Sequence, residues 1–587
     1  MYITVVPNRH SPPAVLLRQG WREGSKTRQR TLANLSHWPQ QKIETLRRLL
    51  RDETLVSPEE LLTTQKTLPH GHVEAILAMI HKLGLDSAIA AKRSRERDLV
   101  VGMIVQRLIA PASKLGTTRA WHATTLAEEL GVEEATEDDL YEAMDWLLAR
   151  KERIEKKLAA RHLSEGGLVL YDVSSSFYEG RTCPLAQFGH DRDGKKGLPI
   201  IVYGVMTNGE GCPVAVEVYR GNTGDPTTVG DQVAKLRERF ELQRVVMVGD
   251  RGLLTPPQIE KLKQHSGLGW ITALPSGAIR ELVENGALQL SLLDQKHLAE
   301  ITSPDYPGER LVVCHNPLLA EERARKREAL LEATEKSLAK VSKEVTRRKQ
   351  KPLQAGEIGL KVGKVLGRYK VGKHFECKIA EGRFEWARRE DSIAQEARLD
   401  GIYVLRTSEP AERLSAEETA RSYKRLAEVE RAFRCLKGMD LLVRPIRHRT
   451  VERVPAHIFL CVLAYYVEWH LRRAWAPLLF EDEERHEERP RRDPVLPAKP
   501  SPSAQAKKRS HRTADGLPVH SLATLLAELG SRARVTYRLK AGKLEEKSNA
   551  TFQQVPEPTP LQARADELLR MFSVVGKGTL DDLPGNQ

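Results

Sequence analysis

The chain has 587 residues, of which 40% are hydrophobic and 29% are charged. A chain of this length should form three or four domains of roughly 150 residues, each with a buried core. Lys and Arg (93) outnumber Asp and Glu (79), which gives a net charge of +14. This excess favours a polyanionic partner, with nucleic acid as the leading candidate. A basic surface that serves only solubility is the alternative.

Several classes of protein are disfavoured by simple patterns. The six cysteines are widely spaced and no two form a CxxC pair, which argues against a zinc ribbon or a disulfide scaffold and fits a reducing cytosol. The first residues show no signal-peptide pattern. The apolar stretch HIFLCVLAYYVEWHL (457–471) is too short before Glu468 to cross a bilayer. We therefore expect a buried helix there and no membrane association.

The N-terminal third divides into two parts. Residues 1–40 alternate apolar and polar side chains and contain basic turns, which is typical of a small β unit. Residues 41–163 carry apolar side chains at three- and four-residue spacing, which predicts helices. Thr136 is a suitable N-cap for one of these helices.

Two short apolar runs between 164 and 275 are followed by an acid. LVLY (168–171) leads into Asp172, and RVVMVG (244–249) leads into Asp250. Short continuous apolar runs predict buried strands. Asp is common in turns where strands stop, but a strand end can also hold a carboxylate rigidly at a cleft. Because two strands end in the same way, the turn interpretation is weaker for both. Between them, Asn208-Gly209 predicts a hairpin.

Residues 276–410 have mixed short segments and predict an insertion. In its charged helix, apolar and small side chains recur with 3-4-3-4 spacing at Leu331, Thr334, Leu338, Val341 and Val345. This spacing suggests a short coiled-coil arm or helical hairpin, and an internally packed helix is the alternative.

A strong helix is predicted over 415–437, with Ser415 as N-cap and Glu418 in a capping box. Tyr423, Glu430, Arg434 and Lys437 fall on roughly one face of it. This face is either an ordinary solvated surface or one wall of a site that handles phosphates.

The C-terminal part of the chain, after residue 480, divides into two segments. Residues 481–515 are rich in Pro, Arg, Lys and Ser and predict a flexible basic linker. Residues 516–587 predict only an indistinct C-terminal tail.

The order of these elements and their residues resemble a DDE transposase of a bacterial insertion sequence. The subgroup carries a helix signature of Tyr, two residues, Arg, three residues, Glu, six residues and Lys. Tyr423, Glu430 and Lys437 fall at three of these positions, whereas Leu426 occupies the Arg position and Arg425 precedes it. The resemblance spans roughly 60–470 and includes the stretches YDVSSSFYEG, VGDRGLLT and VERAFRCLKGMDLLVRPIRHRT.

The resemblance implies a multi-domain α/β protein with a ribonuclease H-like core. Its first part would span 164–275 and its catalytic Glu helix 411–480, separated by the insertion 276–410. Asp172, Asp250 and Glu430 would be the catalytic and metal-binding triad. They would hold two Mg²⁺ ions, about 3.5–4 Å apart, with Mn²⁺ as a possible substitute.

The resemblance also implies roles for nearby cations. Tyr423, Arg434, Lys437 and Arg251 would contact DNA phosphates; the alternative for each cation is a surface ion pair. His190 is expected on a basic hairpin near DNA rather than as a ligand or base, and Trp270 is expected in the core.

By the same resemblance, the enzyme would cleave the ends of an insertion sequence and join them to target DNA. Residues 1–163 would recognise the terminal inverted repeats through segments such as 28–39 and 110–122. We expect a homodimer on double-stranded DNA in a bacterial cytoplasm, associated with the nucleoid. The alternatives are a ribonuclease H-like nuclease without strand transfer and a non-catalytic DNA-binding derivative. A glycosidase with paired carboxylates fits the basic charge poorly.

Overall fold

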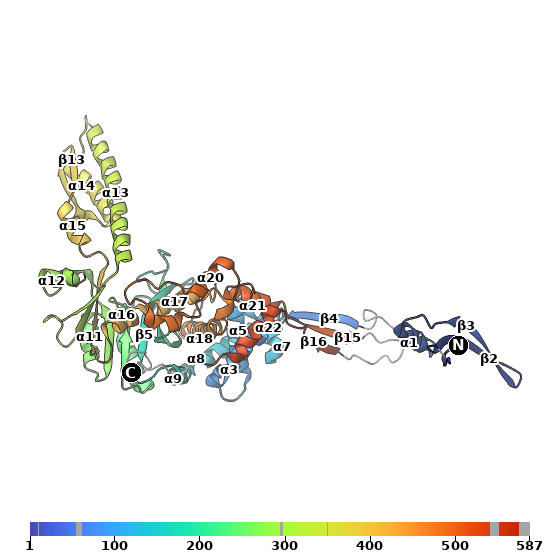
Figure 1. The fold of residues 1–587 in the computed structure, drawn as a ribbon. Helices are drawn as coiled ribbons and strands as arrows, with labels where there is room; N and C mark the ends of the chain where they lie inside the picture. The colour runs from blue at the N-terminus through green and yellow to red at the C-terminus, as the bar shows by residue number, and fades with distance from the viewer. Residues whose placement is uncertain (10, 54–61, 294–296, 349, 540–550, 575–587) are drawn as a thin grey trace. The chain divides into compact units, whose positions relative to one another are not determined.

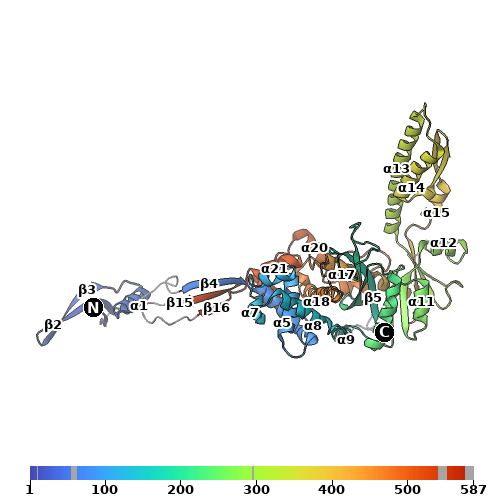
Figure 2. The same cartoon turned by 180° about the vertical axis from the view of Figure 1, so that it is seen from behind.

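The computed structural model describes residues 1–9, 11–53, 62–293, 297–348, 350–539 and 551–574 (Figures 1 and 2). The chain forms two compact units. One consists of Met1–Leu68 with Ala533–Pro556, and the other of Pro69–Arg532 with Glu557–Gln587. The protein is a multi-domain α/β chain with one large mixed sheet.

The smaller unit contains two three-stranded sheets. The first is β1-β2-β3, which confirms the strands expected in residues 1–40, and it is followed by α1. The second has the order β16-β15-β4, so strands from opposite ends of the sequence share it. The sequence did not predict this pairing, because the region 516–587 lacks a clear strand pattern. The bounds are β1 (Tyr2–Val6), β2 (Ala14–Glu23), β3 (Lys26–Asn34), α1 (Gln40–Leu49), β4 (Leu62–Pro69), β15 (Ala533–Leu539) and β16 (Thr551–Gln554).

The larger unit begins with a group of helices that packs around one long apolar helix, α18 (Arg453–Ala474). An 18-residue window of α18 is apolar enough to cross a membrane, but 94% of it is buried within the protein, as expected for a core helix. Thr136 caps α8 in a capping box, as predicted. The helices of this group are α3 (Gly71–Lys82), α4 (Leu85–Ile89), α5 (Arg95–Ile109), α6 (Lys114–Trp121), α7 (Leu126–Leu130), α8 (Glu137–Leu148) and α9 (Lys151–His162).

The large sheet has the order β10-β11-β14-β9-β8-β5-β6-β7. Its centre, β5, β8 and β9, is parallel, and strands on both sides are antiparallel. The hairpin expected at Asn208-Gly209 joins β6 to β7. The strands are β5 (Leu168–Phe177), β6 (Ile200–Asn208), β7 (Pro213–Arg220), β8 (Val245–Val248), β9 (Leu268–Ala273), β10 (Leu298–Ile301), β11 (Arg310–His315) and β14 (Ile402–Thr407).

Strand β5 does not end at Asp172, contrary to the expectation. It continues to Phe177, and β6 pairs with it from Val169 to Phe177. The serines after Asp172 are buried in the sheet rather than exposed in a turn, and the Ser176 hydroxyl lies 2.9 Å from the Tyr203 hydroxyl. Only the parallel neighbour β8 stops at this level of the sheet.

The insertion divides into two parts. Strands β10, β11 and β14 extend the large sheet beyond β9. The rest is an arm with a small core of its own, formed by α13 (Pro317–Arg347), α14 (Ala355–Tyr369), β12 (Phe375–Ala380), β13 (Arg383–Arg388) and α15 (Glu390–Ala397). The five residues with 3-4-3-4 spacing are the buried residues of α13, and they face α14 and the β12-β13 hairpin. The charged helix is therefore packed within the arm, as the alternative to a coiled coil predicted.

The linker expected over 481–515 is instead packed against the larger unit. Val495 and Ser501 are buried, and Lys507 donates to the backbone oxygens of Ala476 and Glu481 at 2.9 and 2.8 Å. The prediction of a flexible linker was wrong because it relied on amino-acid composition. Composition does not show which side chains are buried or which of them bind backbone oxygens. This segment contains α19 (Arg485–Glu488) and α20 (Pro502–Ser510), and α21 (Leu522–Gly530) and α22 (Pro560–Met571) come after it.

Candidate active site

Asp172 and Asp250 are brought together by the register of two parallel strands. Leu168, Val169 and Leu170 of β5 pair with Val246, Met247 and Val248 of β8. Continuing this register by two residues puts Asp172 opposite Asp250. Residues opposite each other on neighbouring strands point to the same face of a sheet. The two carboxylates therefore lie side by side where β8 ends.

Glu430 approaches the same place from α17 (Leu426–Lys437), which packs against β5. Burial, together with the negative charges of Asp250 and Glu430, raises the pKa of Asp172 to about 7. Mutual repulsion of this kind requires the carboxylates to be near one another. The structure thus brings together the three acids that the sequence singled out.

The three carboxylates form no ion pair with the described part of the chain. The charge of Arg192, which pairs with Asp225, acts on Asp172 without an ion pair between them. Asp172 Oδ1 accepts the backbone N–H of Val173, and Asp250 Oδ1 accepts that of Leu253, both at 2.8 Å. Gathered carboxylate oxygens that are not paired with a cation are the donor set that hard divalent ions prefer. The residues present therefore fit a divalent metal site.

Tyr423 lies beside this cluster at the end of α16 (Ala416–Lys424). Burial raises the pKa of its hydroxyl to about 12, and the charges of Asp250, Arg251 and Glu430 all act on it. The predicted helix over 415–437 is in fact two helices, α16 and α17, which meet at Arg425. Tyr423 is thus a neutral hydroxyl donor close to the acids.

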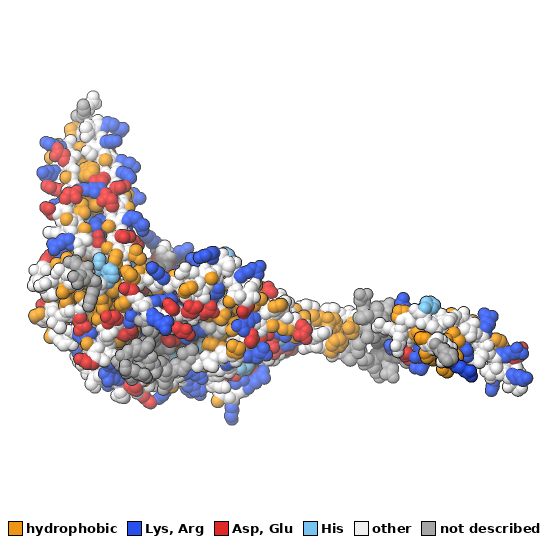
Figure 3. Space-filling model, viewed as in Figure 1, with side chains coloured by type: hydrophobic (Ala, Val, Ile, Leu, Met, Phe, Trp, Pro, Cys, Tyr) orange, Lys and Arg blue, Asp and Glu red, His pale blue; other side chains and the backbone are white. Residues whose placement is uncertain are grey.

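Arg251, which follows Asp250 directly, lines a basic cavity. A cavity of about 380 Å³ separates the core from the base of the arm, and Arg251, Arg280, Arg323 and Lys326 are among the residues that line it. The arm above it exposes further cations on α13, including Lys336, Lys340 and Lys343. Figure 3 shows Lys and Arg side chains along the arm with Asp and Glu among them. This region can contact a polyanion next to the acids.

The two cations predicted at the end of α17 differ in their surroundings. Arg434 is exposed. Lys437 instead donates to Asp193 at 3.0 Å, and Arg444 also pairs with this carboxylate. The Asp193 side chain is only 1% exposed and accepts the backbone N–H of Phe177 at the end of β5. Lys437 is therefore held by a buried acid rather than free for a phosphate.

Sequence reasoning missed Asp193. It lies in the segment GHDRDGKKG, where three neighbouring basic residues suggested a solvated hairpin. An acid among basic residues gives no indication of burial, because its partners Lys437 and Arg444 are about 250 positions away. In the same region His190 is exposed, and Trp270 is buried in the core as expected.

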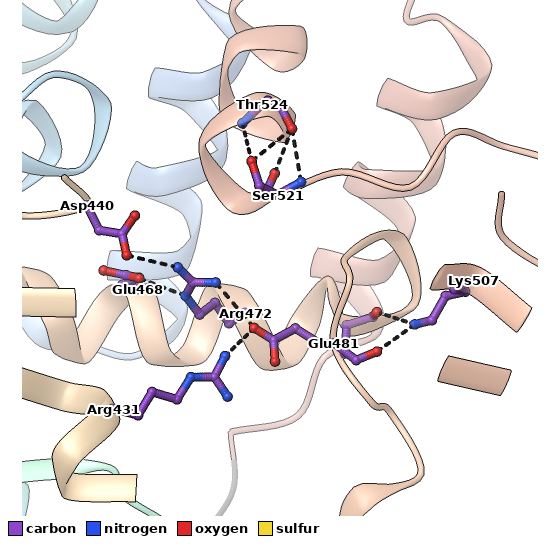
Figure 4. A network of polar contacts seen from close by, with 9 residues as sticks. Arg431, Asp440, Glu468, Arg472, Glu481, Lys507, Ser521 and Thr524 are labelled. Atoms are coloured by element: carbon purple, nitrogen blue, oxygen red, sulfur yellow. Dashed lines mark hydrogen bonds and ion pairs between the residues drawn. The ribbon is translucent and has the colours of Figure 1, made fainter. Parts of the chain in front are cut away.

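A second set of ion pairs fixes α17 from its other side (Figure 4). Arg472 of α18 donates to the buried Glu468 at 2.7 Å and to Glu481 at 3.2 Å, and Arg431 also pairs with Glu481. Arg431 follows Glu430 directly. The network therefore anchors the helix that carries the third acid, as a rigid site requires.

Two family models match parts of this chain. Residues 181–467 match the family described as "Transposase DDE domain". Residues 3–61 match "IS1634 family transposase, N-terminal domain". Together the two matches cover more than half of the chain. The chain belongs to the DDE transposases of bacterial insertion sequences.

The transposase is also similar to a solved structure. It matches the cryo-EM structure of a piggyBac transposase synaptic complex with hairpin DNA at 10% identity and a TM-score of 0.33, over 78% of this chain and 77% of that one. No curated protein matches the chain.

Membership of this family establishes the transposase as an enzyme of DNA transposition. DDE domains use divalent metal ions, and DNA is their partner. The family match begins at residue 181 and so excludes Asp172. The assignment of Asp172 to the site therefore depends on the strand register and on the charges around it.

Proposed function

We propose that Asp172, Asp250 and Glu430 are the catalytic triad with which this transposase cleaves the ends of its element and joins them to target DNA. The observation that carries the proposal is the convergence of the three acids without an ion pair to the described part of the chain. The order β7-β6-β5-β8-β9 at the centre of the sheet, with an acid on β5 and another after β8, supports a ribonuclease H-like core.

The triad would hold two divalent ions, and we propose Mg²⁺, with Mn²⁺ as a substitute. When bound, such ions activate the attacking oxygen and stabilise the leaving oxygen of an in-line displacement at phosphorus. Asp172 would be a ligand of these ions together with Asp250 and Glu430, whose charges both act on it. Its rigid position within a strand paired on both sides supports this role.

Neighbouring side chains would orient the DNA strand. Tyr423 remains protonated at neutral pH and would donate to a phosphate oxygen near the scissile bond. Arg434 and Arg251 are exposed cations on the two sides of the triad and would bind flanking phosphates. Lys437 would act through its pair with Asp193, which keeps its charge near the site.

Other parts of the chain would hold the DNA. We propose that the N-terminal unit and the helices up to residue 163 recognise the terminal inverted repeats, and that the basic base of the arm holds the strand beside Arg251. Two element ends must be cut together, so we propose a homodimer that works on the bacterial nucleoid in the cytoplasm.

The test is a plasmid excision and strand-transfer assay. The donor carries the DNA that flanks the coding sequence, and wild type is compared with Glu430→Gln in Mg²⁺. We expect products from wild type and at least a 10³-fold loss in the variant, because one ligand oxygen and one charge are removed from the site.

The matched control is Glu428→Gln, two residues earlier on α17, where the acid pairs with Arg485 instead of facing the triad. Its activity should stay near that of wild type. Equal products from Glu430→Gln and wild type would refute the triad assignment.

A further inference from the structure

A second cavity in the larger unit has basic residues as its only charged lining residues. It has a volume of about 330 Å³ and lies between the start of α6, α8 and the loop that joins α17 to α18. Its charged and imidazole side chains are Arg107, Lys114, Arg444, Arg447, His448 and His457. No Asp or Glu lines it. Neither the triad nor the arm includes this cavity.

Two of these cations are buried without a counter-ion. Lys114 is 4% exposed and Arg107 is 7% exposed. Arg107 donates to the backbone oxygens of Leu441 and Leu442 at 3.3 and 3.4 Å. Within the described ranges, no ion pair involves either residue. A buried charge of this kind is costly unless something neutralises it.

The pKa shifts of the residues that line the cavity are consistent with this excess of positive charge. Burial, together with the charge of Arg107, lowers the pKa of Lys114 to about 7. Burial and the charges of Lys114 and Arg107 lower the pKa of His448 to about 3. These directions describe a strongly positive potential. Residues 111–114 also line the cavity, and α6 begins at Lys114, so the positive end of the helix dipole adds to it.

One further polar atom at the cavity lacks a partner. His457 donates from Nε2 to the backbone oxygen of Val443 at 3.1 Å, and its Nδ1 is buried with no hydrogen bond in the part of the chain that the structure describes. Buried polar atoms are nearly always satisfied. Because Nε2 carries the proton, Nδ1 is an acceptor, so the case for an anion rests on Lys114 and Arg107 rather than on this nitrogen.

The cavity is linked to the triad by Asp193. Arg444 lines the cavity and pairs with Asp193, which also holds Lys437 of the catalytic helix. The loop that forms the wall pairs with the end of β5, since Ile446 accepts the backbone N–H of Glu179 at 2.9 Å. A ligand in the cavity would therefore contact a loop that is hydrogen-bonded to the end of the strand that carries Asp172.

We propose that this cavity binds a phosphate group of the DNA on which the transposase acts. The group would accept hydrogen bonds from Lys114 and Arg447 and compensate the buried charge of Arg107. The source is either the 5′-terminal phosphate of a cleaved strand or an internal phosphodiester. This inference rests on the protein acting on DNA and is independent of which residues form the triad.

The test measures DNA binding rather than cleavage. The full-length protein, without divalent metal, is titrated with a labelled duplex of one element end at several salt concentrations. We expect Lys114→Met to weaken binding about tenfold at low salt. The slope of log Kobs against log salt should become less negative by about one, as expected for one lost phosphate contact. Lys508→Met is the matched control, because Lys508 is exposed on α20 and lies outside both the cavity and the proposed DNA-end-binding region; its slope should not change.

Thermal unfolding separates this role from a structural one. Removing a buried, unpaired charge should leave the Tm of Lys114→Met at or above that of wild type. If this variant does not fold, Arg447→Gln replaces it, because the Arg447 side chain is 71% exposed and its loss cannot disrupt a core. The same change of slope is then expected.

Two duplexes distinguish the sources of the phosphate. If wild type prefers a 5′-phosphorylated end over a 5′-hydroxyl end and Lys114→Met does not, the cavity binds the terminal phosphate. If neither protein discriminates but the affinity and slope still differ between them, it binds an internal phosphodiester. Equal affinity and slope for Lys114→Met and wild type on both duplexes would overturn the proposal.

Discussion

The carboxylate cluster and the cationic cavity are opposite in charge and alike in construction. In each, side chains of one sign gather without an ion pair to the described part of the chain: Asp172, Asp250 and Glu430 at the triad, and Arg107 and Lys114 in the cavity. Asp193 lies between them and binds Lys437 and Arg444. The comparison shows how the fold prevents opposite charges from neutralising each other, so that each cluster remains available to a ligand.

The largest effect is expected from breaking this separation at Asp193. Asp193→Asn removes a buried charge from two cations, which should lower the free energy of unfolding by about 3 kcal/mol. Lys437 and Arg444 would then be free to move toward the triad, and cleavage should fall about 10²-fold. Urea unfolding and the excision assay measure the two effects.

The control for this change is Glu179→Gln. Glu179 pairs with Arg447 at 2.9 Å, but both side chains are largely exposed, at 43% and 71%. Surface pairs contribute little, so stability and cleavage should change only slightly. If Asp193→Asn behaved like this control, Asp193 would not separate the two clusters.

A smaller effect concerns the pH dependence of metal binding at the triad. Burial, with the charges of Asp250 and Glu430, raises the pKa of Asp172 to about 7. Below that pH the metal-free protein holds a proton on Asp172 that a metal ion must displace. The apparent affinity for Mg²⁺ should therefore fall about tenfold per pH unit below 7 and level off above about 8. Isothermal titration calorimetry between pH 5.5 and 8.5 measures this, and a flat profile would contradict it.

The smallest effect is expected at Tyr423. Its hydroxyl stays protonated because burial raises its pKa to about 12, so Tyr423→Phe removes one hydrogen-bond donor and little else. We expect about a fivefold decrease in kcat/KM for cleavage, equivalent to about 1 kcal/mol, with no change in Tm. Tyr369→Phe in the arm is the control and should retain full activity. Equal rates in the two variants would exclude a role for the Tyr423 hydroxyl.

The parts of the fold that depend on local patterns could be predicted from sequence. The apolar runs before Asp172 and Asp250 predicted adjacent buried strands, and the spacing of Leu331, Leu338 and Val345 predicted the buried face of α13. The end of β5 was expected at Asp172 rather than at Phe177, because small polar residues such as Ser175 and Ser176 look the same after a strand and within a buried strand. Only the pairing of β6 along β5 distinguishes the two cases.

For the candidate site too, only the residues that belong to local sequence patterns could be predicted. The three acids could be chosen because two come directly after an apolar run and the third occupies a helix position in a known signature. Asp193 and Lys114 could not be chosen from the sequence. Asp193 is distinguished by burial and by its pairing with distant cations, and Lys114 by burial without an ion-pair partner among the described residues. Such properties arise from contacts between segments far apart in the sequence, which no local pattern encodes.

The arm leaves the sheet at the end of β11 and returns at the start of β14, where His315 is paired with Ile402 and the backbone N–H of Asn316 donates to Gly401 at 2.9 Å. Both junctions are thus neighbours in one antiparallel ladder, the geometry that a short hairpin turn also closes. The arm is therefore joined to the sheet through two adjacent chain ends, and the β11-β14 ladder that carries it closes without any residue of the arm between the two strands.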